Sequence, residues 1–269
     1  MTFDSVWAVG AGNMAGAMLH RWLATGMDPA RLTVIRKSGA AFADGVATFS
    51  AVPPGAAAAD MVMLGVKPQM LDLVAGPLAA AMRPGTVLVS ILAGVEIAAL
   101  RARFPTARIV RAMPNLPVAI GRGVVALYAA EPEPDAVLRA AMDRLMAPLG
   151  LVEWLDDEAA MDVAAAVAGS GPAFLYRFVD ALAAAGVAAG FGQDQAARLA
   201  LATVAGAAEQ ARGGEASPAA MAERVASPGG STRKGLDVLD ADGALVSLMT
   251  RMIAAAVARN REMAAAARG

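Results

Sequence analysis

The sequence predicts an α/β domain built on a largely parallel sheet, followed by an all-helical domain. In the first half of the chain, short and almost wholly apolar runs alternate with alanine-rich stretches of helical period. That alternation is typical of βαβ units, in which a helix connects two parallel strands. After about Asp156 the β-branched runs stop, and only helical stretches follow. We therefore expect a first domain over residues 1–156 and a helical domain over residues 157–269.

The expected strands are short and apolar, as strands covered by helices on both faces should be. In chain order they are Val6–Val9, Leu32–Ile35, Met61–Val66, Val87–Ile91, Arg108–Arg111, Val124–Leu127 and Leu151–Leu155, the last at an edge of the sheet. Helices are expected between several of them, at Asn13–Thr25, Gln69–Met82 and Ala136–Ala147.

The helices expected in the second domain have alanine-rich apolar faces. They are Asp157–Ala168, Pro172–Ala189, Gln193–Gly213, Pro218–Ala226, Thr232–Leu239 and Gly243–Ala267. Small side chains allow helix axes to approach closely. A lone helical domain of this size would leave too much apolar surface exposed, so we expect a homodimer or a larger homo-oligomer.

Composition excludes several classes of function. A net charge of −1 gives no electrostatic basis for binding nucleic acid or an anionic membrane. The absence of cysteine excludes disulfides and thiolate metal sites, and the single histidine, His20, cannot build a zinc cluster or a Ser-His-Asp triad. Mean hydropathy is high at +0.51, but we find no run of roughly 20 predominantly apolar residues and no signal peptide. We expect a cytoplasmic protein with neither a metal nor a membrane span.

A glycine-rich turn follows the first expected strand and opens the first expected helix. It reads Gly10-Ala11-Gly12-Asn13-Met14-Ala15, which is the context that a dinucleotide-binding fingerprint requires. Gly10 permits the tight turn, Gly12 lets the backbone approach a pyrophosphate at the helix N-terminus, and alanine at the third position allows close packing. The alternative is a structural glycine turn. The motif predicts a Rossmann-type domain that binds a nicotinamide dinucleotide.

The second expected strand ends in Arg36-Lys37-Ser38, with no carboxylate nearby to bind a ribose 2′-hydroxyl. Two cations and a hydroxyl suit a 2′-phosphate, so the tip favours NADPH. Tips of this kind can also accept NADH, and the alternative is an ordinary solvated basic turn.

Three further loops should face the same crevice, because ligands bind beyond the carboxyl ends of parallel strands. Candidate cofactor contacts in these loops are Val66, Lys67, Pro68, Ala93, Gly94 and Asn115. Asn115 lies between two prolines, which would make its amide a rigid contact; the alternative is a turn residue.

Two loops in the helical half place glycines and hydroxyls at a helix start. One contains Ser170 and Gly171, and the other contains Gly229, Gly230, Ser231 and Thr232. Backbone N–H groups exposed at such a position bind carboxylates. Each loop alone is better explained by ordinary helix capping by Ser170 or Ser231 than by a binding site. Two such loops in a chain with a cofactor domain favour an anion site.

Taken together, these motifs resemble the pyrroline-5-carboxylate reductase family over nearly the whole chain, from Gly10 to about Met263. The motifs follow one another in the family's order. They are Gly-x-Gly-x-Met-Ala at Gly10, Val-Lys-Pro-Gln at Val66, Arg-x-Met-Pro-Asn at Arg111, Gly-Ser-Gly-Pro-Ala at Gly169, Ser-Pro-Gly-Gly-x-Thr at Ser227 and Arg-x-x-Glu-Met at Arg259.

The resemblance implies NADPH-dependent reduction of 1-pyrroline-5-carboxylate, a cyclic imino acid, to L-proline, the last step of proline biosynthesis. It also implies an intertwined helical dimer. Carried over by position, the loop from Gly229 to Thr232 matches the family's carboxylate-binding loop, and Thr232 matches a hydroxyl close to the imine nitrogen. This chain departs from the family at three places. The family usually has threonine at the position of Leu116, often has tyrosine at the position of Phe174, and commonly has a more apolar pair where Arg233 and Lys234 stand. These departures bear on substrate contacts and turnover.

Elementary chemistry agrees with this implication. An imine can take its proton from water before the cofactor delivers hydride, so no strong general acid is required. Two alternatives stay open: another imine or β-hydroxyacid reductase of the same architecture, and a non-catalytic NADP-binding regulator. The long helix Pro172–Ala189 offers only Arg177 and Asp180, where β-hydroxyacid dehydrogenases usually place a lysine or an aspartate facing the nicotinamide.

Overall fold

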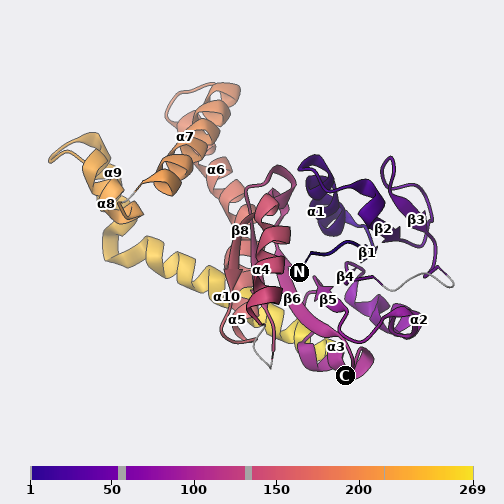
Figure 1. The fold of residues 1–269 in the computed structure, drawn as a ribbon. Coiled ribbons are helices and arrows are strands. Elements are labelled where there is room, and N and C mark those ends of the chain that lie inside the picture. The colour runs from indigo at the N-terminus through magenta and orange to yellow at the C-terminus, as the bar shows by residue number, and fades with distance from the viewer. Residues whose placement is uncertain (1, 54–58, 131–134, 215, 269) are drawn as a thin grey trace. The chain divides into compact units, whose positions relative to one another are not determined.

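The structure is a computed structural model that describes residues 2–53, 59–130, 135–214 and 216–268. The chain forms two compact units. One consists of residues 1–170 together with residues 256–269, and the other consists of residues 171–255. Figure 1 shows the elements of both units in chain order.

The first unit contains one mixed sheet, and the described residues contribute eight strands to it in the order β3-β2-β1-β4-β5-β6-β7-β8. All neighbouring pairs are parallel except β6 and β7. The strands are β1 Val6–Val9, β2 Leu32–Ile35, β3 Ala47–Phe49, β4 Met61–Leu64, β5 Val87–Ser90, β6 Arg108–Pro114, β7 Gly123–Tyr128 and β8 Gly150–Trp154. The Rossmann-type sheet predicted from sequence is confirmed, including the edge position of the last strand.

The strand order reverses at β1, which pairs with β2 on one side and with β4 on the other. Val9 lies opposite Ile35 of β2 and opposite Leu64 of β4. The loops that follow these strands therefore emerge at the same edge of the sheet. A reversal of this kind opens the crevice in which such folds bind ligands.

Helices cover both faces of the sheet. Along β1, Val6 and Ala8 belong to one apolar cluster, whereas Trp7 and Val9 belong to the other, as the two-residue period of a strand requires. The helices of this unit are α1 Asn13–Ala24, α2 Leu71–Ala81, α3 Ile97–Arg103, α4 Ala136–Met146 and α5 Ala160–Ala164, with short helical turns at Pro29–Arg31, Pro68–Met70, Leu116–Ile120, Ala147–Leu149 and Ala165–Gly169.

The second unit is helical. Its described elements are α6 Gly171–Ala188, α7 Gln193–Gly213, α8 Pro218–Val225, α9 Ser231–Asp240, the turn Ala241–Gly243 and the first half of α10 Ala244–Arg268. Helices α6 and α7 pack against each other. Large apolar side chains stay exposed on these helices, among them Leu175, Tyr176, Leu201, Val238 and Val246. The predicted all-helical domain is confirmed, with more uncovered apolar surface than one unit can bury alone.

The helical stretch from Ser231 to Ala265 contains an apolar window that the sequence analysis did not single out. It is long and apolar enough to cross a membrane by length and composition, with a mean hydropathy of 1.4 in its most apolar window. Asp242, at φ 52°, breaks the helical geometry inside the stretch. None of the window is buried within the chain, so its apolar side chains need cover from outside it.

The division into units differs from the division expected at residue 156. Although the last strand ends at Trp154, residues up to Ser170 still belong to the sheet unit. The reason is packing: Met161 and Ala166, which follow the last strand, are buried in that unit, and so is Ala264 of α10. The chain thus leaves the sheet unit after Ser170 and returns to it at Ala256.

Candidate active site

The turn after β1 has the geometry expected of a dinucleotide loop. Gly10 has a φ of +92°, and a Cβ atom there would lie 2.7 Å from the backbone of Gly65. Only glycine fits a backbone that combines a positive φ with so close an approach. The Gly10 N–H donates to the Ile35 carbonyl at 2.8 Å, and the Gly65 N–H donates to the Val9 carbonyl at 2.8 Å. These bonds hold the ends of β1, β2 and β4 together beneath the turn.

Helix α1 begins directly behind this turn. Gly12 is its N-cap residue, and no side chain caps the helix there. The first intrahelical bond runs from the Gly16 N–H to the Gly12 carbonyl, so the N–H groups of Asn13 and Met14 have no helical acceptor. A Cβ atom at Gly12 would meet nothing within 4 Å. The helix start therefore offers open backbone donors and a favourable dipole to an anion.

Gly65 is a part of this cradle that the sequence analysis missed. A Cβ atom at Gly65 would lie 2.7 Å from the Ala15 Cβ and 3.1 Å from the Gly10 carbonyl oxygen. The third position of the fingerprint, Ala15, packs at the same point. The sequence analysis overlooked the glycine directly after β4 (Met61–Leu64), the strand that pairs with β1.

The basic tip after β2 forms a tight turn. The Gly39 N–H donates to the Arg36 carbonyl at 2.8 Å, and the Arg36 N–H pairs with Phe49 of β3. One terminal nitrogen of Arg36 donates to the Ala41 carbonyl at 3.3 Å. Its Nε is buried and has no partner among the described residues, while Lys37 and Ser38 are exposed. An unpaired guanidinium nitrogen beside two exposed donors fits a 2′-phosphate.

The loops after β4 and β5 bring the next predicted cofactor residues to the same edge of the sheet. Lys67 is exposed and precedes the turn that begins at Pro68, and Val66 is half-buried. Ala93 is exposed, and Gly94 has a φ of +72°. A Cβ atom at Gly94 would lie 3.3 Å from the backbone of Ala264. The end of α10 therefore packs directly against the loop that follows β5.

Both polar atoms of the Asn115 side chain already have hydrogen-bond partners within the protein. Its Oδ1 accepts from the Val124 N–H at 2.8 Å, and its Nδ2 donates to the Ala168 carbonyl at 3.0 Å. The residue is only 6% exposed. These bonds tie the end of β6 to β7 and to the segment before α6. The amide predicted as a rigid cofactor contact is thus held by two protein partners, and the cofactor contact itself stays a prediction.

A buried ion pair lies close to this point. Arg111 of β6 pairs with Glu158 at 2.8 Å, and their side chains are 5% and 28% exposed. The same Glu158 oxygen accepts from the Ile97 N–H at 2.7 Å, at the start of α3. Glu158 therefore joins β6, α3 and the segment before α5. Sequence reasoning missed this contact, because 47 residues separate the partners.

Ser170 and Gly171 do not form the open loop expected from sequence. Residues Ala165–Gly169 form a π-helical turn, and the Ser170 N–H donates back to the Ala165 carbonyl at 2.9 Å. Ser170 has helical backbone angles, so it is not the N-cap of α6, and Gly171 already begins that helix. The backbone continues almost as one helix, which leaves the Ser170 N–H satisfied.

The second glycine loop does form an open helix start. Gly229 has a φ of +71°, and Gly230 is the N-cap residue of α9 with no side-chain cap. Ser231 is therefore the first residue of the helix and not its cap. The Lys234 N–H donates to the Gly230 carbonyl at 3.2 Å, so the N–H groups of Ser231 and Thr232 precede the helical ladder. Both residues are exposed.

One cation is fixed beside this loop. Arg233 donates to Glu223 of α8 at 2.6 Å, and this hydrogen bond raises the pKa of the Arg233 guanidinium. The contact joins the start of α9 to α8. Lys234 lies 3.8 Å from Asp237 of its own helix. Nothing in the part of the chain that the structure describes gathers three metal-ligating side chains.

Two family models match the chain. Residues 158–263 match the model described as pyrroline-5-carboxylate reductase dimerisation, and residues 6–94 match the model described as NADP oxidoreductase, coenzyme F420-dependent. The first part of the chain is thus the nucleotide-binding domain of an oxidoreductase, and the helical part is a dimerisation domain.

Comparison with known proteins extends over nearly the whole chain. The pyrroline-5-carboxylate reductase of Pseudomonas aeruginosa is 36% identical in an alignment of 264 positions, which covers 95% of this chain and 95% of the relative. That of Pisum sativum is 34% identical over 95% of this chain and 94% of the relative. Among solved structures, the reductase of Coxiella burnetii has a TM-score of 0.90 at 32% identity, covering 97% of this chain and 98% of its own.

A structure from Plasmodium falciparum, titled as pyrroline carboxylate reductase with NADP bound, has the same fold, with a TM-score of 0.83 at 23% identity and coverage of 98% of this chain and 99% of its own. The resemblance inferred from the motifs is confirmed by these relatives. The chain belongs to the pyrroline-5-carboxylate reductase family, the oxidoreductases that reduce 1-pyrroline-5-carboxylate to proline.

Proposed function

We propose that this chain uses NADPH in preference to NADH to reduce 1-pyrroline-5-carboxylate to L-proline in the cytoplasm, as a homodimer or a larger homo-oligomer. The observation that carries the cofactor preference is the tip after β2. There Arg36 has a buried Nε without a partner among the described residues, beside the exposed Lys37 and Ser38. Charge-assisted hydrogen bonds from these three side chains would bind a 2′-phosphate.

The rest of the cofactor follows from the edge of the sheet. The pyrophosphate would bind the turn at Gly10 and Gly12 and the open N–H groups of Asn13 and Met14. The nicotinamide half would bind along the later loops, which Asn115 also holds in place through its two hydrogen bonds. Contacts proposed for that half are Val66, Lys67, Pro68, Ala93, Gly94 and Asn115.

The substrate carboxylate would bind the second glycine loop. Gly229 and Gly230 leave the backbone uncovered, and α9 presents the N–H groups of Ser231 and Thr232 at its start. The helix dipole adds about half a positive charge at this end. The Thr232 hydroxyl would donate to the carboxylate or contact the imine nitrogen. Ser170 and Gly171 are proposed as further contacts, through the Ser170 hydroxyl and the backbone where α6 begins at Gly171.

For the reduction of the imine, the main contribution required of the protein is to orient the substrate and the cofactor. Bound NADPH supplies the hydride, which adds to the imine carbon. The ring nitrogen would take a proton from solvent, so that the C=N bond becomes a C–N bond and the cofactor leaves as NADP⁺. This chain contributes by aligning the planar imine and by holding its carboxylate. The lack of a histidine at the proposed site is therefore no obstacle.

Assembly follows from the helical unit. Its helices leave large apolar side chains exposed, and residues 158–263 match a dimerisation domain. A second copy of the chain would cover these faces, including the apolar stretch from Ser231 to Ala265.

One assay tests the proposed activity against its alternatives. Purified protein is mixed with 1-pyrroline-5-carboxylate and either NADPH or NADH, and cofactor oxidation is followed by absorbance. We expect NADPH oxidation with proline as the product and a lower KM for NADPH than for NADH. Activity on other cyclic imines or on β-hydroxyacids alone would assign the chain to another reductase of this architecture. NADPH binding without oxidation of any substrate would assign it to a regulator.

A further inference from the structure

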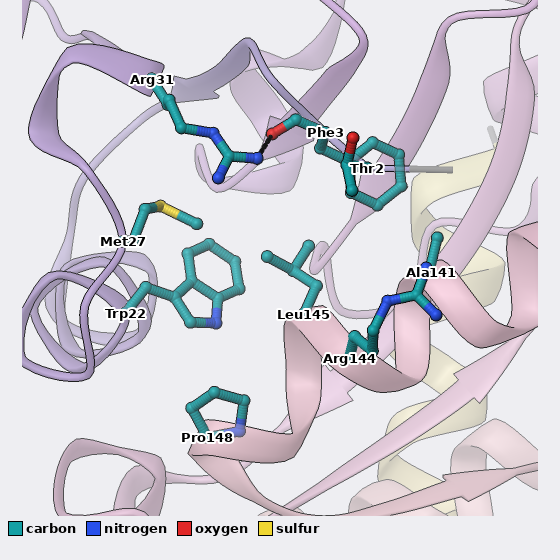
Figure 2. A pocket seen from close by; sticks show the side chains of 9 residues that line it. All are labelled: Thr2, Phe3, Trp22, Met27, Arg31, Ala141, Arg144, Leu145 and Pro148. Atoms are coloured by element: carbon teal, nitrogen blue, oxygen red, sulfur yellow. Dashed lines mark hydrogen bonds between the residues drawn. The ribbon is translucent and has the colours of Figure 1, made fainter.

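A cavity lies at the amino edge of the sheet, at the opposite end of the strands from the proposed cofactor loops. It has a volume of about 220 Å³. Phe3, which precedes β1, and Arg31, which precedes β2, line one side of it, and Leu145 of α4 lines another. Figure 2 shows the complete lining, which also contains Thr2, Trp22, Met27, Ala141, Arg144 and Pro148.

Trp22 places an unsatisfied donor in this cavity. The residue is only 2% exposed, and its indole Nε1 is buried with no hydrogen-bond partner among the described residues. Figure 2 shows the indole edge that carries this nitrogen turned toward the open space beside Leu145 and Pro148. A buried N–H without an acceptor costs free energy. The donor is therefore best explained by a group that enters the cavity and accepts from it.

Arg31 adds a cation to the same cavity. One of its terminal nitrogens donates to the Phe3 carbonyl and lies 3.3 Å from a carboxylate oxygen of Asp4. The Arg31 Nε is buried and has no partner in the part of the chain that the structure describes. Because the Asp4 side chain is largely exposed, water screens this ion pair and leaves much of the guanidinium's attraction for a second anion.

Apart from Thr2 and Arg144, the rest of the lining is apolar. Met27, Leu145 and Pro148 face the cavity around the Trp22 ring, and Figure 2 shows them grouped on one side of the Arg31 guanidinium. A ligand that satisfies this lining needs an anionic acceptor at one end and a compact hydrocarbon body at the other. A phosphate or a sulfate would leave the apolar walls without a partner, and a pure hydrocarbon would leave the Trp22 N–H unpaired.

We propose that this cavity binds a small organic carboxylate with a compact apolar body, such as a five-membered carbocyclic acid, at a site separate from the active site. The carboxylate accepts from the Trp22 N–H. The Arg31 guanidinium, which Figure 2 shows beyond the six-membered ring of Trp22, and Arg144 of the same lining attract it at longer range. The hydrocarbon body packs against Met27 and Leu145. Trp22 follows Asn13 by nine residues along α1, which is about 14 Å at 1.5 Å per residue, so the ligand and the cofactor pyrophosphate do not touch.

The experiment measures direct binding of cyclopentanecarboxylate to the full chain by ligand-observed NMR and by calorimetric titration. Its neutral analogue, cyclopentanecarboxamide, has the same shape without the charge. We expect the carboxylate to bind at least tenfold more tightly than the carboxamide. Trp22→Phe removes the N–H and keeps an aromatic ring, and it should weaken carboxylate binding roughly tenfold, the value of one hydrogen bond to a charged group.

Two variants control this result. Trp154→Phe removes an indole N–H that already donates to Asp143, outside the cavity, and should leave binding unchanged. Thr232→Ala alters the proposed substrate loop and should also leave binding unchanged. Reductase activity of Trp22→Phe near the wild-type value shows that the variant folds. Equal binding of carboxylate and carboxamide, unchanged binding to Trp22→Phe, loss of binding in Thr232→Ala, or no binding at all would each overturn the proposal.

Discussion

At the scale of single residues, the proposed cofactor preference depends on Arg36 and Lys37, the two cations at the tip after β2. Each hydrogen bond to a phosphate contributes about 1.5–3 kcal/mol. Arg36→Asp combined with Lys37→Ser should therefore raise the KM for NADPH by at least a hundredfold, on the order of two such bonds. The KM for NADH should change little, because NADH carries no 2′-phosphate.

Steady-state kinetics with both cofactors checks this prediction, and NADH serves as the internal control. Arg36 also donates to the Ala41 carbonyl, so a loss of fold would raise both constants together. A parallel rise of the two KM values would show that the tip does not recognise the phosphate.

Thr232 tests the proposed substrate loop. Thr232→Ala removes a hydroxyl at the exposed start of α9 and should lower kcat/KM for 1-pyrroline-5-carboxylate by roughly tenfold to a hundredfold, the effect of one hydrogen bond to a charged group. Thr232→Ser keeps the hydroxyl and should retain most of the activity.

NADPH affinity, measured by fluorescence titration, should be the same in both Thr232 variants and the wild type. If Thr232→Ala keeps full kcat/KM, or if it weakens NADPH and substrate equally, the loop is only a helix start, and the substrate carboxylate binds elsewhere.

Between elements, the Arg111–Glu158 pair holds β6 to α3 and to the segment before α5. Removing one member of a buried pair leaves an uncompensated charge and costs about 3–5 kcal/mol. Arg111→Met should therefore lower the Tm by about 10 °C, at roughly 2–4 °C per kcal/mol for a unit of this size. Differential scanning fluorimetry measures the shift.

The exposed pair of Arg177 and Asp180 provides a matched control, since their side chains are 85% and 73% exposed. Arg177→Met should change the Tm by about 1 °C or less, because solvent-exposed pairs contribute little. Equal shifts in the two variants would mean that the Arg111–Glu158 pair does not stabilise the sheet unit.

The elements that sequence predicted well are those whose burial is strongest. Strands β1 and β2 agree with their predicted bounds, because both are apolar runs covered on both faces. Strand β3 and helix α3 were missed. Strand β3 is three residues long and half exposed, and α3 is a seven-residue helix with no side-chain cap. Neither is long enough to show a period of its own.

The candidate site was predictable where a local conformation requires a particular residue. Gly10 and Gly229 have positive φ angles, and glycine in a turn signals this directly. Contacts between distant segments gave no such signal. The amide of Asn115 is occupied by Val124 and Ala168, and nothing in the local sequence indicates that these partners lie close by.

For the whole molecule, the exposed helical faces predict association. Light scattering at micromolar concentration should give a mass of at least twice that of one chain, which is 27.1 kDa. Because apolar burial drives the assembly, moderate salt should not dissociate it. A stable monomer that retains reductase activity would contradict the proposed oligomer.

The return of the chain to its first unit has a consequence for biosynthesis. Asn260 of α10 donates to the Asp162 carbonyl at 3.0 Å, and Ala264 packs against Gly94. A ribosome must therefore finish residues 171–255 before the nucleotide-binding domain receives its last segment. Stalled nascent chains that end at residue 255 should remain more protease-sensitive over their first 170 residues than chains that extend past Ala264. The unit that is translated first therefore completes its folding only after the final helix has been synthesised.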